Sequence, residues 1–164
     1  MHQEVNNMEE RLNEIYGKIA DTLNDTIPEE WDKIYMYGEI GEGVREAFFY
    51  YYPSESNEPV YSHKIPEIFD ISEDEYDKLW YQLLDNLTEL WNEFKNNGQE
   101  TWTNLTFVLD NEGRFKIEYD YTDLSDADDI ERQIIWEYKY LGIIPEDEDE
   151  KKIIEEYIKS TQNK

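Results

Sequence analysis

The spacing of apolar residues along the chain predicts two helices in its N-terminal two-thirds. Apolar positions that recur every three to four residues predict one helix over 7–25, with Asn6 or Asn7 as its N-cap. A stronger repeat predicts a second helix over 72–97, whose apolar face runs for about six turns. We expect this long helix to be the central element against which a sheet packs.

Between these two helices, residues that favour strands predict a β-hairpin. β-branched and aromatic residues fill 31–40 and 44–52, and the Gly-Glu-Gly sequence at 41–43 supplies a tight turn between them. After a loop rich in Pro and Ser, the pattern predicts a short strand over 60–64. The hairpin therefore precedes the long helix in the chain.

A second hairpin follows the long helix. We expect strands over 102–109 and 114–121, with the turn residues 110–113 between them. In the second of these strands, aromatic and aliphatic residues alternate with charged ones. Such alternation is typical of a strand with one buried face and one exposed face.

Two helices are expected to end the chain. The first covers 128–141 and is capped by Ser125 or Asp126, and the second covers 146–160, after Pro145 at its start. Together these elements predict an α+β fold, in which an antiparallel sheet built from two hairpins packs against the long central helix. The N-terminal helix and the two C-terminal helices complete this arrangement.

Composition indicates a folded chain with a strongly acidic surface. Phe, Trp and Tyr make up 15% of the 164 residues, more than disordered chains contain. We expect a single domain over 1–164, with frayed ends at 1–6 and 160–164. The 41 Asp and Glu residues outnumber the 15 Lys and Arg residues, which gives a formal net charge of −26. This charge repels nucleic acid and anionic membranes and attracts basic proteins.

The sequence also carries expectations about location. The N-terminus lacks the basic and apolar regions of a secretion signal, and no apolar run approaches the ~20 residues that span a bilayer. Cysteine is absent, which fits a reducing compartment and removes disulfides and thiolate metal sites. We therefore expect a cytoplasmic protein that binds neither nucleic acid nor membrane.

The acidic residues gather in two patches in the C-terminal third. On a helix, the unbroken run 146–150 would place five charges within roughly 7 Å, and two strand residues at 118 and 120 lie ~6.8 Å apart, close to two nucleotide steps. Such patches suit contact with a nucleic-acid-binding protein, although a solvated surface is the simpler explanation for any single acid. The first patch comprises Glu118, Asp120, Asp123, Asp126, Asp128 and Asp129, and the second comprises Glu146, Asp147, Glu148, Asp149 and Glu150.

Aromatic residues interleave with these patches. Tyr121 and Tyr140 are candidate anchors, because aromatic side chains dominate the binding energy of many interfaces. Core packing is the alternative for the aromatic residues around them, above all for Trp136 and for Tyr119 together with Tyr121.

Catalytic, metal-binding and cofactor motifs are not apparent in the sequence. Phosphate-binding glycine motifs are absent, and His63 stands without a nucleophile motif around it. A calcium loop starting at Asp126, with Asp128 and Glu137 as further ligands, has Ile130 and Glu131 at positions where the motif needs a ligand and a glycine. We expect no catalytic residue, no metal ligand and no cofactor.

Several stretches, taken in their order along the chain, resemble the YezG family of bacterial immunity proteins, and the similarity runs from about Met8 to Tyr157. They are Ile27-Pro28-Glu29-Glu30-Trp31, Tyr61-Ser62-His63-Lys64-Ile65-Pro66, the hairpin from Trp102 to Tyr121, and Trp136 to Glu146. The resemblance implies a cytosolic antitoxin, usually encoded beside a large toxin that a type VII secretion system exports. The C-terminal domain of such a toxin is typically a nuclease, and the family has no catalytic residues to carry over.

The charge and the resemblance lead to one interpretation. We expect a non-enzymatic immunity protein that binds a basic nuclease toxin domain one to one, with the two acidic patches covering the toxin's active-site cleft and Tyr121 and Tyr140 as anchors. The sequence leaves three alternatives open. These are an inhibitor or chaperone of another cationic protein, an enzyme with a carboxylate-held Mg²⁺ or Ca²⁺, and a surface adapted to high salt.

Overall fold

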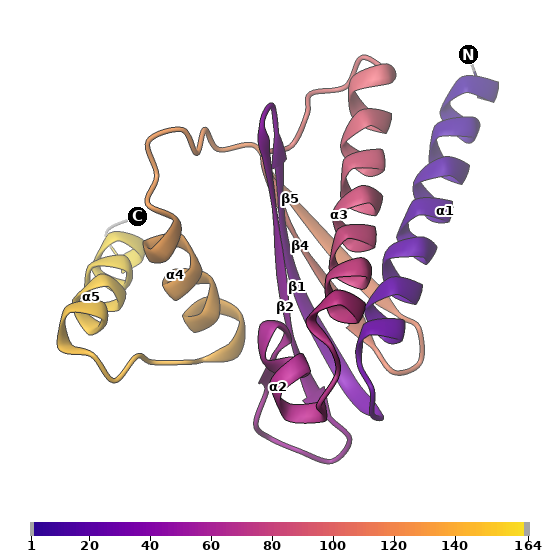
Figure 1. The fold of residues 1–164 in the computed structure, drawn as a ribbon. Coiled ribbons are helices and arrows are strands. Elements are labelled where there is room, and N and C mark those ends of the chain that lie inside the picture. Colours follow the sequence, from indigo (N-terminus) through magenta and orange to yellow (C-terminus); the bar gives the residue numbers. More distant parts are fainter. Residues whose placement is uncertain (1, 163–164) are drawn as a thin grey trace. The chain divides into compact units, whose positions relative to one another are not determined.

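The computed structural model describes residues 2–162, with side chains from Asn7 onward, and its contacts divide into two compact units, 1–122 and 123–164 (Figure 1). The prediction of one domain over the whole chain is not tested by this division and stays a prediction. The elements in chain order are α1 (His2–Thr26), β1 (Trp31–Gly41), β2 (Val44–Pro53), β3 (Val60–Tyr61), a 3-10 turn (Ser62–Lys64), α2 (Ile65–Phe69), α3 (Glu73–Asn96), β4 (Asn104–Asp110), β5 (Phe115–Asp120), α4 (Asp129–Leu141) and α5 (Glu148–Gln162).

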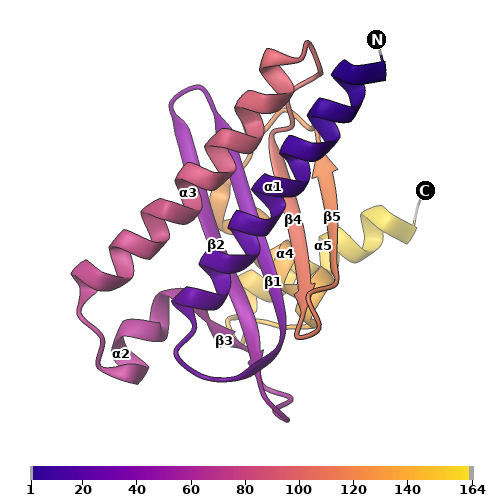
Figure 2. The same cartoon turned by 90° about the vertical axis from the view of Figure 1, so that its right-hand side faces the viewer.

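The first unit is an antiparallel sheet with two helices on one face. Its five strands lie in the order β3-β2-β1-β4-β5, so the two predicted hairpins meet where β1 pairs with β4. The helices α1 and α3 run side by side across the sheet (Figure 2). The predicted α+β fold, with two hairpins packed against a long central helix, is therefore confirmed.

The core lies between the sheet and the pair of helices. Side chains of one sheet face, such as Met36, Phe49 and Phe107, are fully or almost fully buried there. At Gly38 on β1 the helix α3 comes so close that a Cβ atom would lie 2.9 Å from Cδ1 of Leu87. Glycine at this position therefore allows the central helix to lie close to the sheet.

A polar cluster fixes α1 against α3 inside this otherwise apolar layer. The amide Nδ2 of Asn86 donates to Oγ1 of Thr22 at 2.8 Å, and that hydroxyl donates to the carbonyl of Lys18 at 2.9 Å. Thr22 and Asn86 are both buried. Because each polar group has a partner, the cluster sets the register of the two helices without an unpaired buried group.

The opposite sheet face is rich in aromatic side chains. Neighbouring strand residues point to opposite faces, and Phe48 is buried like Phe49, so both faces of β2 are covered at this point. Phe48 stacks on Tyr37 with ring centroids 5.3 Å apart, and the Tyr37 hydroxyl donates to Oε1 of Glu39 at 2.8 Å. The buried carboxylate of Glu39 thus has a hydrogen-bond donor on its own strand.

Two sequence predictions in the first unit are wrong in detail, and one short helix was not predicted. The helix α1 begins at His2, so Asn6 and Asn7 lie inside it and do not cap it, because a cap residue needs a non-helical backbone. The strand expected over 60–64 is only two residues long and is followed by a 3-10 turn and by α2, which no apolar repeat indicated. At its single turn of helix, α2 is too short for such a repeat to appear.

The second unit is a pair of helices joined by a short connection. Gly142 adopts a left-handed backbone conformation with φ of 69° and ends α4 after Leu141, the last residue of the predicted range. The buried apolar side chains of this unit are Ile134 and Trp136 of α4 and Ile154 of α5. The rings of Tyr138 and Tyr157 meet edge to face, with centroids 6.3 Å apart.

Two predicted helix starts in this unit are wrong. The cap of α4 is Asp128 and neither Ser125 nor Asp126, because only the Asp128 carboxylate accepts from the free N–H groups of the first turn. The helix α5 begins at Glu148, so Pro145 does not lie at its start. The helix α5 ends at Gln162. A frayed end was expected at 160–164, and of these residues 163–164 lie outside the described part of the chain.

Candidate functional site

The predicted acidic patches occupy three separate segments. Glu118 and Asp120 lie on β5 in the first unit, while the other four residues of the first patch lie in the connection before α4 and at its first position. The second patch lies just before α5 and in its first turn. The first patch is therefore divided between the two units.

On β5, both carboxylates make local contacts. Glu118 lies 3.3 Å from Nζ of Lys116, and Asp120 accepts from the hydroxyl of Thr122 at 2.8 Å and from Nδ2 of Asn104 at 3.1 Å. Partial burial opposes ionisation of Asp120, but the hydrogen bonds from Thr122 and Asn104 outweigh it and lower the pKa of this carboxyl. Asp120 is thus an ionised group that also closes the end of the hairpin.

Before α4, the acidic residues mostly stabilise the chain's own turns. Asp123 accepts from the backbone N–H of Ser125 at 3.0 Å, which lowers the pKa of its carboxyl. Asp128 caps α4 by accepting from two backbone N–H groups, at 2.9 and 3.1 Å. Asp129 pairs with Arg132 at 2.6 Å. Carboxylates at a helix N-terminus are also favoured by the helix dipole.

The run at 146–150 is not a single stretch of helix. Since α5 begins at Glu148, the prediction that all five charges follow one another along a helix is wrong. All five residues nevertheless lie just before the helix or in its first turn. Asp147 accepts from the backbone N–H of Glu150 at 3.1 Å, as an N-cap does. Glu148 and Asp149 lie 3.5 and 3.9 Å from Lys151 and Lys152.

Three acids of the predicted patches differ from the rest. Among the residues that the structure describes, the carboxylates of Asp126, Glu146 and Glu150 have no hydrogen-bond or ion-pair partner. Asp126 precedes α4, whereas Glu146 and Glu150 lie at the start of α5, at the other end of the helix pair (Figure 1). The 13 residues of α4 separate these ends by roughly 20 Å.

The aromatic candidates have different surroundings. Trp136 is buried, and Tyr119 packs against Phe94 with ring centroids 5.0 Å apart, so the core alternative is confirmed for both. Tyr121 is 42% exposed, which makes the core alternative wrong for this residue. Tyr140 is partly buried, with Lys139 Nζ 5.2 Å from its ring centroid. Tyr121 is therefore the more accessible of the two proposed anchors.

The described part of the chain offers little for metal or proton chemistry. Among the side chains that the structure describes, from Asn7 to Gln162, no three His, Asp or Glu residues converge as metal ligands. The ring of His63 packs edge-on against Tyr61, Tyr76 and Trp80, and its Nδ1 lies 2.8 Å from the Tyr76 hydroxyl. None of the helices in this range has the length and apolar character that crossing a bilayer requires.

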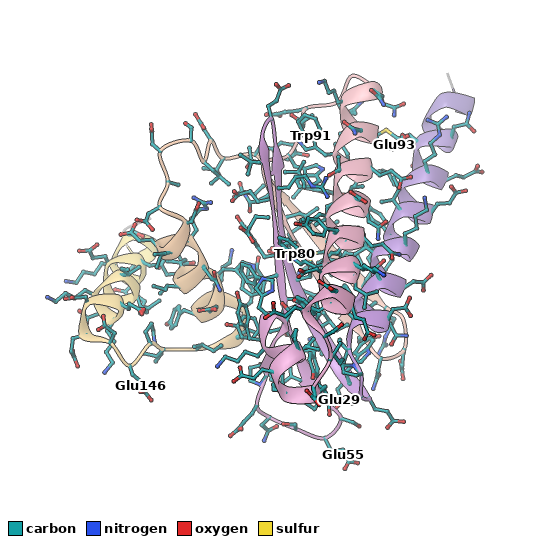
Figure 3. The ribbon with its side chains drawn as sticks, viewed as in Figure 1. Glu29, Glu55, Trp80, Trp91, Glu93 and Glu146 are labelled. Atoms are coloured by element: carbon teal, nitrogen blue, oxygen red, sulfur yellow. The ribbon has the colours of Figure 1, made fainter. Side chains whose placement is uncertain are left out.

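Two hollows in the first unit were not predicted from the sequence. One, of about 400 Å³, lies at the start of β1, where the lining includes Glu29, Trp31 and Asp32. The other, of about 370 Å³, lies between the β1–β2 turn and α3, and its lining includes Val44 and Trp91. Figure 3 shows Glu29 and Trp91 near opposite ends of the sheet. Both hollows join segments far apart in the sequence, so no local pattern could indicate them.

Comparison with known proteins gives a consistent result. The family described as "Immunity protein YezG-like" matches residues 12–155. An "Immunity protein YezG" of Bacillus spizizenii is 44% identical to this chain over 114 residues, which are 70% of this chain and 71% of that protein. The protein of the same name in Bacillus subtilis is 41% identical over 113 residues, 69% of this chain and 75% of that protein.

A staphylococcal relative has a different name. The "Type VII secretion system protein EsaG" of Staphylococcus aureus is 38% identical over 115 residues, which cover 70% of this chain and 71% of that protein. The family match extends over both units described above, from α1 into α5. The chain therefore belongs to the YezG-like family of immunity proteins.

Proposed function

We propose that this chain is an immunity protein that binds the nuclease domain of a cognate secreted toxin and covers its basic active-site cleft with an acidic surface. The observation that carries the proposal is the family match over residues 12–155. The name of the staphylococcal relative supports a toxin exported by a type VII secretion system. Inhibition is by binding alone, one chain to one toxin domain, without chemistry or cofactor.

The surplus of carboxylates supports a basic partner. Even if every Lys and Arg paired with one acid, a formal charge of −26 would remain unpaired. A nuclease binds phosphate groups through Lys and Arg, so its cleft has the opposite sign. Complementary charge of this kind raises the association rate and has a smaller effect on the final affinity.

The hydrogen bonds and ion pairs that each acid makes within the chain indicate how available it is to bind the toxin. Asp120 and Asp128 hold the chain's own backbone, and replacing either one would disturb the fold as well as the charge. Asp126, Glu146 and Glu150 are free to approach a cation of the toxin without breaking an internal bond. We propose these three, with Tyr121 at the end of β5, as the first contacts, and the remaining acids of the two patches as their electrostatic background.

The experiment pairs this chain with the nuclease domain encoded beside it. Co-expression should restore growth to cells that produce this domain, and the two proteins should elute together at a one-to-one ratio. A catalytically inactive toxin domain serves as the control for toxicity that is unrelated to nuclease activity. Absence of both binding and protection would refute the proposal. Binding to an unrelated basic protein with equal affinity would favour a general inhibitor or chaperone of cationic proteins.

A further inference from the structure

The hollow between the β1–β2 turn and α3 has a mainly apolar lining. Ile40 lies deep in it, Val44 forms its hairpin side, and Trp91 and Thr88 form its helix side. Val44 is 43% exposed, so its side chain is accessible to a ligand in the hollow. We call this hollow the hairpin groove; its lining is completed by Gly41, Gly43, Arg45 and Asn92.

The shape of the hairpin groove follows from the turn. Gly43 has φ of 74°, a left-handed conformation that glycine adopts without strain, and this closes the hairpin in two residues. A Cβ atom at Gly43 would meet nothing within 4 Å, and one at Gly41 would only touch Val44. The two glycines line the hollow without adding a side chain to it.

Ion pairs brace the two walls at both ends. Arg45 of β2 pairs with Asp85 of α3 at 2.8 Å, and Glu42 of the turn lies 3.8 Å from Nζ of Lys95 on α3. Along the helix, Asp85 and Lys95 are roughly 15 Å apart. Each exposed pair contributes little stability, but together they hold the turn over the helix and leave the groove's rim without net charge.

Trp91 is fixed in place. Its indole N–H donates to the carbonyl of Trp102 at 3.1 Å, and Lys95 Nζ lies 5.4 Å from its ring centroid. The side chain is only partly buried, and Figure 3 places it between α3 and the tip of the β1–β2 hairpin. A held aromatic ring loses little conformational entropy when a ligand packs on it, which is a property of interface hot spots.

The charge of the chain decides what can occupy the groove. A second copy would bring another −26 charge and be repelled, whereas a cationic protein is attracted. Because the rim charges are already paired with each other, the part of that protein that enters the groove should be apolar. Acidic patches speed capture, but a slow dissociation rate needs a desolvated apolar centre.

We propose that the hairpin groove receives an apolar side chain of the cationic toxin domain and provides the anchor that slows its dissociation. This inference rests on the proposed function for the identity of the partner. It adds a second contact region, on β1, β2 and α3, which lies outside both acidic patches and entirely within the first unit.

The test measures association and dissociation rates of the adjacent-gene nuclease domain with Val44→Asp, Val44→Thr and the matched control Ile68→Asp. Ile68 on α2 is 54% exposed and lies outside the groove lining, so its variant carries the same added charge. Val44→Asp should speed dissociation about tenfold or more and leave the association rate unchanged. Val44→Thr should speed dissociation by a smaller factor, and Ile68→Asp should leave the dissociation rate unchanged. Equal dissociation rates for both Asp variants would overturn the proposal, and Val44→Thr keeps the test valid if Val44→Asp unfolds the hairpin.

A second readout does not depend on the toxin. Spectra of the full chain are recorded by nuclear magnetic resonance during titration with the peptides Ac-Arg-Phe-Arg-NH2 and Ac-Arg-Ala-Arg-NH2. Saturable shifts of the Trp91 and Val44 signals with the Phe peptide, and weaker ones with the Ala peptide, would support the groove even if the chain failed to bind the nuclease domain. Equal shifts with both peptides, or shifts elsewhere only, would overturn the groove while leaving the proposed function standing.

Discussion

Replacing Gly38 by Ala should destabilise the first unit, because the new methyl group has no room. Its Cβ would lie 2.9 and 3.2 Å from the two terminal carbons of Leu87, and Leu87 is fully buried. Carbon atoms in contact prefer about 3.5–4.0 Å, so α3 or the Leu87 side chain must shift by roughly 0.6 Å or more. Overpacking of this kind costs about 1–3 kcal/mol, which exceeds the 0.4–1 kcal/mol that Ala gains over Gly through the unfolded chain.

The measurement is the free energy of unfolding from urea titration. Gly17→Ala is the matched control, because Gly17 lies exposed on α1 with nothing within 4 Å of its Cβ position, and there Ala should stabilise the helix by about 1 kcal/mol. Leu87→Ala alone should cost about 2–5 kcal/mol, but combined with Gly38→Ala it should cost less than the sum. A Gly38→Ala variant as stable as the native chain, or strictly additive effects in the double variant, would refute the reasoning.

The remaining predictions concern single side chains. Asp128→Ala should lower the stability of α4 by about 1 kcal/mol through loss of its N-cap, while Asp126→Ala should leave that stability unchanged. Amide hydrogen exchange in α4 measures both effects, and equal effects would contradict the assigned roles. Asn86→Ala should cost about 1–3 kcal/mol in urea unfolding, since the buried Thr22 hydroxyl loses the nearer of its two side-chain donors and keeps only the longer bond from Gln82, and no loss would contradict this. Partial burial, partly offset by Asp77, lowers the pKa of His63, so the stabilisation from its neutral ring is complete above pH ~6.5 and declines below it. His63→Gln should therefore flatten the stability profile below about pH 6.5, and an unchanged slope there would exclude His63 as the source.

The strong apolar repeats were sufficient to predict the main elements. The helix expected over 72–97 is α3 (Glu73–Asn96), and Ser72 caps it by accepting from the N–H of Glu75. Both hairpins were predicted within a few residues of their observed ends, because Gly and Asn mark their turns. Long periodic segments are reliable because many residues indicate the same structure.

Predictions based on one or two residues were less successful. Ser125, Asp126 and Asp128 are all good N-cap residues, and only the hydrogen bonds to Ile130 and Glu131 distinguish Asp128. The last helix was predicted to begin at 146 but begins at Glu148, because a run of five acids has no periodicity that marks a helix start. A local pattern predicts that a cap exists nearby but does not identify the residue.

The sequence proposes which acidic residues form the candidate site but not how they are arranged in space. Charge density identified the two acidic patches, and the structure distinguishes the acids engaged with their own backbone, such as Asp120, from the unpaired Asp126 and Glu146. The hairpin groove was beyond sequence reasoning, since it joins Val44 to Trp91 across the fold. Contacts between distant segments depend on packing, which periodicity does not specify.

The most direct test of the acidic surface is the association rate with the adjacent-gene nuclease domain at low and high salt. One triple variant carries Asp126→Asn, Glu146→Gln and Glu150→Gln, and a control of equal charge carries Glu10→Gln, Glu14→Gln and Asp21→Asn on the exposed side of α1. The first variant should associate about tenfold more slowly at low salt, the control should stay within about twofold of the native chain, and the difference should shrink at high salt. Equal rates for the two variants would contradict the claim that these carboxylates face the toxin's cleft.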